Sequence, residues 1–186
     1  MAKLFFRYAA MNAGKSTALL QVAHNYEERG HRVRIFTAQL DDRYGRGLVT
    51  SRLGPQREVE QFSPNTDFLA LMGADAGIAC ILVDEAQFLS KQQVEALHEI
   101  AHLRNIPAIC YGLRTDFQGE LFPGSATLLA LADEMDEMKT ICDCGRKATM
   151  NMRVDASNRK VTQGAQVEIG GNARYRSVCG RCFRQG

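Results

Sequence analysis

The sequence predicts an α/β fold with a parallel sheet, followed by a small C-terminal unit. Strand-like and helix-like segments alternate as far as about residue 139, which is the order of βαβ units. Two strand candidates, Ile78–Val83 and Pro107–Gly112, are continuous apolar runs, as expected of parallel strands buried on both faces. From Thr140 the composition shifts to cysteine, glycine and arginine, so we expect one domain over 1–138 and another over 139–186.

The N-terminal elements follow from local pattern. Lys3–Tyr8 is aromatic-rich and predicts a strand. Thr17–Arg29 has apolar residues at helical spacing and is followed by Gly30, which favours a helix that ends there. Arg32–Ala38 alternates polar and apolar residues and predicts the second strand. Gln39–Val59 has little periodicity, several glycines and many charges, so we expect a mobile loop.

Three further helices are expected along the rest of the first domain. They cover Thr66–Met72, Ser90–Arg104 and Thr127–Met138, and Ser90 is a plausible N-cap. His98 and His102 lie four residues apart in the second of these helices, and we interpret them as part of a polar helix face.

Composition and net charge indicate a folded protein without a nucleic-acid or membrane surface. Hydrophobic residues make up 45% of the 186 residues, enough for a folded core. The net charge of +2 does not indicate a nucleic-acid or membrane surface, and no apolar run approaches the ~20 residues of a membrane helix. The N-terminus lacks the features of a signal peptide, so we expect a cytoplasmic protein. Cys80 and Cys110 lie in apolar runs and are interpreted as buried free thiols.

A phosphate-binding loop is predicted between the first strand and the first helix. Gly14, Lys15 and Ser16 match the end of the pattern G-x-x-x-x-G-K-[ST], while Ala9 stands where the first glycine belongs. Backbone N–H groups and the helix N-terminus would surround the phosphates, Lys15 would reach the β- and γ-phosphates, and the Ser16 hydroxyl would bind Mg²⁺. A positive φ would be costly at Ala9. The alternative is a chance turn, but the flanking strand and helix favour ATP binding by Ala9, Ala10, Met11, Asn12, Ala13, Gly14, Lys15, Ser16 and Thr17.

An acidic pair follows the apolar run Ile78–Val83. Asp84 would lie at the carboxyl end of this strand, which we expect to neighbour the strand of the phosphate loop, and would hold Mg²⁺ together with Ser16. Glu85 would face the other way and act as the general base that takes a proton from an attacking hydroxyl. The alternative is that the pair only caps the next helix. We assign Asp84, Glu85, Ala86 and Gln87 to the ATP site as well.

Four cysteines near the C-terminus form two close pairs. Cys142 and Cys144 are separated by one residue, and Cys179 and Cys182 by two. Four thiolates from two short turns suit a closed, structural Zn²⁺ site. An iron–sulfur or redox role and a site without metal remain as alternatives.

Taken together, these motifs resemble cytosolic thymidine kinases of the bacterial and animal type. The resemblance spans essentially the whole chain and rests on Met11–Ser16, Asp84–Phe88, Tyr111–Phe117, the four cysteines and Ile169–Tyr175. It implies a RecA-like P-loop fold with a small zinc-ribbon and lasso domain. It also implies transfer of the ATP γ-phosphate to the 5′-hydroxyl of thymidine or deoxyuridine, with Glu85 as the base.

The resemblance also implies further site residues and partners. Asp41 and Arg43 match residues near the phosphates and metal, and Ile169–Tyr175 matches a lasso that closes over the nucleoside. A homotetramer inhibited by thymidine triphosphate is expected, with no nucleic acid or membrane as a partner. The alternatives without a role in binding are core packing for Phe117 and Phe122, a surface position for Tyr175 and a solvated charge for Arg43. The implied nucleoside-binding residues are Met11, Phe88, Leu113, Phe117, Phe122, Ile169, Gly170 and Tyr175.

Two other functions compete with this one. A nucleic-acid-dependent ATPase would explain the Asp84–Gln87 motif, but a helicase motor needs two such α/β domains and the chain is nearly neutral. A zinc-stabilised nucleotide sensor would explain the phosphate loop and the cysteines, but it leaves Glu85 without a role.

Overall fold

The core of the protein is a parallel β-sheet, seen in a computed structural model that describes residues 1–40, 47–50, 56–73, 77–167 and 174–186. Within these residues the sheet has the strand order β5-β2-β6-β7-β1-β8, and every pairing in it is parallel. Its strands are β1 (Leu4–Ala9), β2 (Arg32–Ala38), β5 (Glu60–Phe62), β6 (Ile78–Val83), β7 (Ala108–Leu113) and β8 (Glu134–Glu137).

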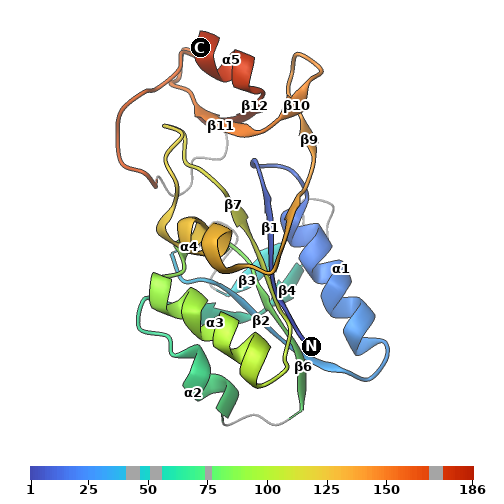
Figure 1. Cartoon of the computed structure of the whole chain (residues 1–186). Helices are drawn as coiled ribbons and strands as arrows, with labels where there is room; N and C mark the ends of the chain where they lie inside the picture. The colour runs from blue at the N-terminus through green and yellow to red at the C-terminus, as the bar shows by residue number, and fades with distance from the viewer. Residues whose placement is uncertain (41–46, 51–55, 74–76, 168–173) are drawn as a thin grey trace.

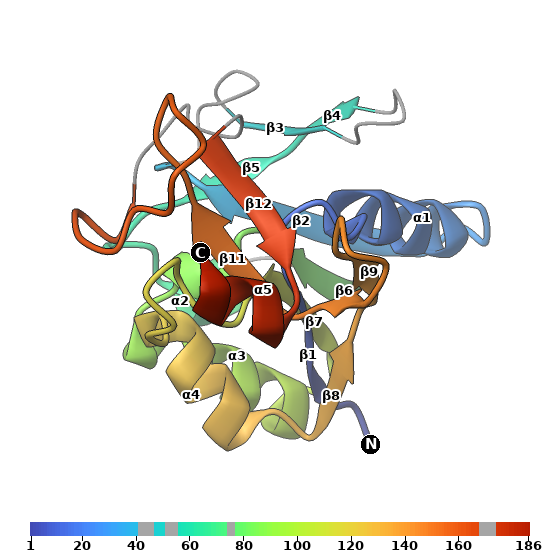
Figure 2. The ribbon, with the colours of Figure 1, turned by 90° about the horizontal axis from the view of Figure 1, so that it is seen from above.

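Helices cover both faces of this sheet (Figures 1 and 2). One face is covered by α1 (Lys15–Glu27), and the other by α2 (Phe68–Gly73), α3 (Lys91–Leu103) and α4 (Pro123–Leu131). Successive residues of β6 therefore enter different cores: Ile81 packs in the core under α3, and Leu82 in the core under α1. This two-sided burial explains why the strand is apolar throughout.

Several predicted elements are confirmed. The second strand and the buried strand β6 have the predicted bounds. Ser90 caps α3 in a capping box, in which its hydroxyl accepts from Gln93 N at 3.2 Å and the Gln93 side chain accepts from Ser90 N at 3.0 Å. Cys80 and Cys110 are fully buried in the two cores, as expected of small apolar residues.

The expectation of a loop over Gln39–Val59 was wrong for its described part. β3 (Leu48–Thr50) and β4 (Gln56–Glu58) form an antiparallel pair in this stretch, and β5 follows it at once. The sequence pattern did not predict these strands because each has only three residues. Backbone pairing fixes them, β3 with β4 and β5 with β2.

The expected helix over Thr127–Met138 was wrong at both ends. α4 begins earlier, with Pro123 in its first turn, and stops at Leu131, after which β8 runs parallel to β1. The residues of β8 are mostly acidic and exposed, a composition typical of an edge strand and not of a buried one. Backbone pairing with β1 decides its conformation, including a 2.9 Å bond from Met138 N to Tyr8 O just beyond its end.

The C-terminal residues form small antiparallel sheets and one short helix above the carboxyl ends of the central strands (Figure 1). A separate apolar cluster holds them together, with Met152, Val178 and Phe183 at its centre. The elements are β9 (Thr140–Ile141), β10 (Lys147–Ala148), β11 (Met150–Arg153), β12 (Tyr175–Val178) and α5 (Gly180–Gln185).

Among the described residues, none of the helices combines the length and the apolar character that crossing a membrane would require.

Candidate active site

The phosphate loop joins β1 to α1 and has two residues with left-handed backbone. Asn12 has φ 63° and Gly14 has φ 79°, and asparagine and glycine are the residues that adopt this conformation most readily. Ala9 is the last residue of β1, paired with Leu113, and its φ is not positive. The missing first glycine therefore causes no backbone strain at this position. The ammonium of Lys15 donates to Ala10 O at 3.2 Å and is largely buried.

Ser16 and Asp84 lie in direct contact, with Ser16 Oγ donating to Asp84 Oδ2 at 2.8 Å. The expectation that their strands are neighbours was wrong, because β7 lies between β1 and β6. The first turn of α1 closes this gap, since Ser16 belongs to that turn and not to the strand. A hydroxyl and a carboxylate oxygen at one point are the hard oxygen ligands that Mg²⁺ prefers, so both residues fit a magnesium ion.

The carboxyl group of Asp84 is in an unusual electrostatic environment. Burial, followed by the negative charge of Glu85, raises its pKa from 3.8 to about 6, although the Ser16 hydroxyl and the Lys15 ammonium act in the opposite direction. Only 4% of the residue is exposed. A buried carboxylate with too little compensating charge is a favourable place for a cation to bind.

Glu85 has a strained backbone and a fixed side chain. Its φ of 53° is in the left-handed region, which costs a residue other than glycine on the order of 1–3 kcal/mol and is concentrated at functional sites. Gln87, which is almost fully buried, donates from Nε2 to Glu85 Oε2 at 2.5 Å. Its other amide atom, Oε1, accepts from Leu113 N at 3.1 Å. The carboxylate of Glu85 is thereby tied to the end of β7.

Two glycines allow the short 3₁₀ helix η1 (Ala86–Phe88) to pack this closely. A Cβ atom at Gly124, in α4, would come within 2.5 Å of Ala86 O. One at Gly112, in β7, would come within 2.9 Å of Gln87 Oε1. Any side chain at either position would displace the backbone that carries Glu85 and Gln87.

The described nucleoside candidates form two aromatic groups. The rings of Phe88 and Phe122 meet edge to face, with centroids 5.8 Å apart. Phe117 is buried, and the guanidinium carbon of Arg153 lies 4.2 Å from its ring centroid. Arg153 Nη1 also lies 3.5 Å from the Tyr175 hydroxyl, so it links Phe117 to β12. Leu113 lies at the end of β7.

Other predicted residues cannot be placed in this way. Asp41 and Arg43 from the expected mobile loop, and Ile169 and Gly170 from the expected lasso, lie outside the described residues.

Contacts from the C-terminal unit to the phosphate loop were not predicted from the sequence. Met11 N donates to Asn151 Oδ1 at 2.8 Å, and Met11 O accepts from Ser177 Oγ at 2.5 Å. Asn151 is almost fully buried and also donates from Nδ2 to Thr115 O at 3.1 Å. A polar residue in a short strand gives no sequence signal for such a role, because its partners lie more than thirty residues away.

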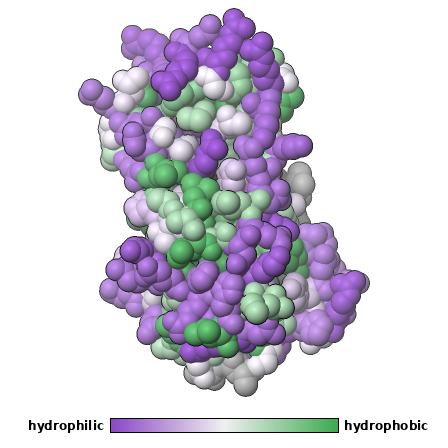
Figure 3. All heavy atoms as spheres, in the orientation of Figure 1, coloured by the Kyte–Doolittle hydropathy of each residue, from purple (hydrophilic) through white to green (hydrophobic). Residues whose placement is uncertain are grey.

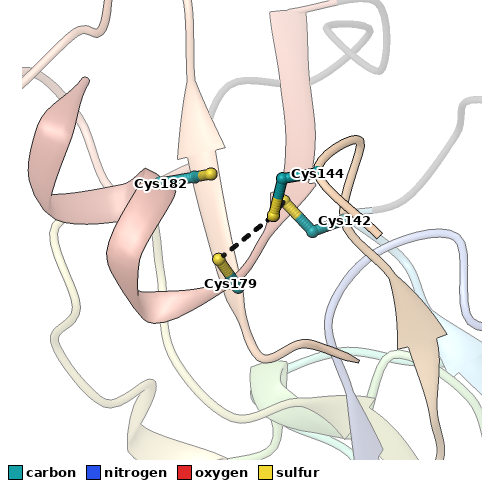
Figure 4. A group of neighbouring side chains, drawn as sticks. All are labelled: Cys142, Cys144, Cys179 and Cys182. Atoms are coloured by element: carbon teal, nitrogen blue, oxygen red, sulfur yellow. Dashed lines mark hydrogen bonds between the residues drawn. The ribbon is translucent and has the colours of Figure 1, made fainter. Parts of the chain in front are cut away.

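The four cysteines converge from the β9–β10 turn and the start of α5 (Figure 4). Their sulfur atoms all lie within 4.8 Å of one another, with Cys144 Sγ 3.5 Å from Cys142 Sγ and 3.6 Å from Cys179 Sγ. Zinc–sulfur bonds of about 2.3 Å in a regular tetrahedron place the sulfurs about 3.8 Å apart. The cluster therefore fits a metal ion such as Zn²⁺.

The acidities of these thiols support a bound cation. Hydrogen bonds from the backbone of Cys144 and then Cys179 lower the pKa of Cys142, and a backbone hydrogen bond from Cys182 lowers that of Cys179 to about 6. Hydrogen bonds with neighbouring sulfurs, first that of Cys144, raise the pKa of Cys182 to about 12. These opposite shifts leave a proton on Cys182 at neutral pH, and a divalent metal would supply the positive charge that favours its ionisation.

Comparisons with known proteins agree with this geometry. The family model "Thymidine kinase" matches residues 2–183. Similar proteins named thymidine kinase include one from Chromobacterium violaceum, 63% identical over 98% of this chain and 98% of its own length. Others are from Ruegeria pomeroyi, 55% identical over 100% of this chain and 95% of its own length, and Agrobacterium fabrum, 56% identical over 97% and 95%.

Proposed function

Since the chain belongs to the thymidine kinase family, we propose that it transfers the γ-phosphoryl group of ATP to the 5′-hydroxyl of thymidine or deoxyuridine. The single observation that carries this proposal is the 2.8 Å contact between Ser16 and Asp84. It joins the phosphate loop to the strand end that bears Glu85, so a nucleotide and an attacking hydroxyl would meet there.

Binding of ATP would use the loop between β1 and α1. The N–H groups at the start of α1 and the ammonium of Lys15 would face the β- and γ-phosphates, because the loop wraps around this helix end. Mg²⁺ supplied with the nucleotide would offset the phosphate charge, held by Ser16 and Asp84. ATP binding by the remaining residues of Ala9–Thr17, and by Ala86 and Gln87, remains a prediction.

Glu85 would position and deprotonate the 5′-hydroxyl. Its hydrogen bond to Gln87, and that of Gln87 to Leu113 N, would keep the carboxylate in one orientation. Catalysis would then depend on positioning and on neutralising charge, as in other phosphoryl transfers. The aromatic groups around Phe88 and Phe117 support a pocket for the pyrimidine ring of the nucleoside, with Phe122 and Tyr175 in the same two groups.

The C-terminal unit would carry a structural Zn²⁺ ion at its four cysteines and close over the nucleoside. Its own apolar cluster is small and includes Cys142 and Cys179 themselves, so the metal would replace a larger core. We expect the segment Ile169–Tyr175 to act as the lasso between β11 and the cysteine pair that begins α5.

Assembly, regulation and location remain predictions. We expect a homotetramer, inhibited by thymidine triphosphate, in the cytoplasm. Hydrophobic residues gather over α4 (Figure 3), where Ala126 and Ala130 are exposed, which supports contact between subunits. Light scattering after gel filtration would test the oligomeric state.

A phosphate-transfer assay tests the proposed function. The protein is incubated with γ-labelled ATP, magnesium and each of the four deoxynucleosides or deoxyuridine, and the products are separated. Label should appear in the monophosphates of thymidine and deoxyuridine, and a Lys15→Met preparation serves as the blank for contaminating kinases. Release of phosphate stimulated by DNA, with no labelled nucleoside, would instead favour the nucleic-acid-dependent ATPase.

A further inference from the structure

A second group of metal-binding side chains lies away from the active site. His98 and His102 come from successive turns of α3, and Asp133 comes from the turn between α4 and β8. One ligand atom from each of the three lies within 4.8 Å of the other two. The imidazole centroids are 4.4 Å apart, and His102 Nε2 is 3.0 Å from Asp133 Oδ2.

This arrangement has the spacing that a metal needs. Two histidines four residues apart on a helix point to one side, and a carboxylate from another element adds a third ligand. Metal–nitrogen and metal–oxygen bonds of about 2.0–2.2 Å bring ligand atoms to about 3–4 Å from one another. The observed separations need only small rotations of these side chains, which are partly exposed and therefore open to an ion.

The groups around Asp133 and His102 favour the binding of a cation. Leu4 N donates to Asp133 Oδ2 at 2.8 Å, and Asp133 N donates to Leu4 O at 2.9 Å, so the carboxylate is fixed to the start of β1. His102 also lies in the last turn of α3, where the negative end of the helix dipole favours positive charge.

From this geometry we propose that His98, His102 and Asp133 form a second metal site, which takes a divalent transition-metal ion with a preference for imidazole, such as Zn²⁺ or Ni²⁺. Asp133 adjoins the first residue of β1, whereas the phosphate loop follows the last, a strand length of about 20 Å away. The site therefore acts by joining α3 to the edge of the sheet at β1 and β8, and its occupancy is separate from that of the cysteine cluster.

The test measures metal binding to the intact, zinc-loaded protein. The zinc content is first brought to one equivalent per chain, which fills the cysteine cluster, and Ni²⁺ or Co²⁺ is then titrated by calorimetry and by visible absorption. We expect one additional equivalent of metal per chain. Its visible spectrum should show only the weak ligand-field bands of a metal ion bound by nitrogen and oxygen atoms. Intense thiolate-to-metal charge-transfer bands would instead show that the added metal had entered the cysteine cluster. If all of the added metal were bound there, the proposal would be wrong.

Matched variants separate the site from general surface binding. His98→Ala and His102→Ala should each weaken binding of the added metal by at least about tenfold. Asp133→Asn should weaken it too while keeping an oxygen to accept from Leu4 N. His24→Ala removes an exposed histidine of α1 and should change nothing.

Melting temperatures give an independent readout. Added Ni²⁺ should raise the melting temperature of the zinc-loaded wild type and of His24→Ala, but not that of His102→Ala. No additional equivalent of metal, or equal binding by wild type and His102→Ala, would overturn the proposal and leave His102–Asp133 as an ordinary ion pair.

Discussion

The sheet side and the C-terminal side of the candidate active site are held in place by different means. Asp84 and the phosphate loop extend strands that are buried on both faces, and Ile81, Leu82 and Val83 are fully buried. The C-terminal unit has strands of two to four residues and a small apolar cluster that includes two cysteines. Buried strands and short hydrogen bonds therefore position Asp84 and Glu85 on the sheet side. The C-terminal side has little core of its own, so we expect it to depend on the cysteine cluster and on its contacts with the loop.

The largest effect is expected on the sheet side, from replacing Glu85, the proposed general base. Glu85→Gln keeps the size of the side chain but cannot accept a proton, so kcat should fall by roughly 10²–10⁴ while ATP binding persists. Steady-state kinetics and calorimetry with ATP check both parts. Turnover near the wild-type rate would show that another group takes the proton.

The C-terminal side should respond to loss of a cysteine without harm to the sheet. Cys144→Ser should lower zinc affinity at least about tenfold and raise the KM for the nucleoside, because the segment between the cysteine pairs loses its anchor. Elemental analysis, kinetics and limited proteolysis within 139–186 measure this. Cys80→Ala, which alters a cysteine buried under α1, should retain its zinc. Freshly purified wild-type protein without zinc would contradict the expectation.

The raised pKa of Asp84 predicts that the stability of the ligand-free protein depends on pH. In the folded protein burial raises the pKa of Asp84 from 3.8 to about 6, so the folded state binds more protons than the unfolded chain between these values. Ionised Asp84 therefore destabilises the ligand-free fold, and this cost is fully present above about pH 6.

Asp84→Asn should accordingly raise the free energy of unfolding by about 1–3 kcal/mol above that pH, although we expect it to impair catalysis. The gain should disappear as the pH falls below about 4. Urea titrations at several pH values would measure it, with Asp136→Asn as an exposed control. An equal gain at all pH values would contradict this explanation.

The smallest effect is expected where the two sides meet. Asn151→Ala and Ser177→Ala each remove a hydrogen bond to Met11, so the KM for ATP should rise roughly two- to tenfold at unchanged zinc content. Ser157→Ala changes an exposed serine in the same unit and is the control. An unchanged KM in both variants would mean that the C-terminal unit does not influence the phosphate loop.

Much of the fold could be read from local pattern. The apolar run of β6, the alternation in β2 and the capping residue Ser90 each act within a few residues, so the sequence displays them directly. The edge strands β5 and β8 could not be read in this way. Their residues are mostly polar, and pairing of β5 with β2 and of β8 with β1 fixes their strand conformation.

In the candidate site, too, some features follow from local sequence and others from contacts between distant segments. Local motifs predict the chemistry: a phosphate loop, an acidic pair after a buried strand and four cysteines at metal-binding spacing. The three-dimensional arrangement adds that Ser16 contacts Asp84 across β7, that Gln87 holds Glu85, and that Asn151 contacts Met11. The physical reason is that motifs depend on neighbours in the chain, whereas hydrogen bonds between distant segments depend on how the sheet and helices pack.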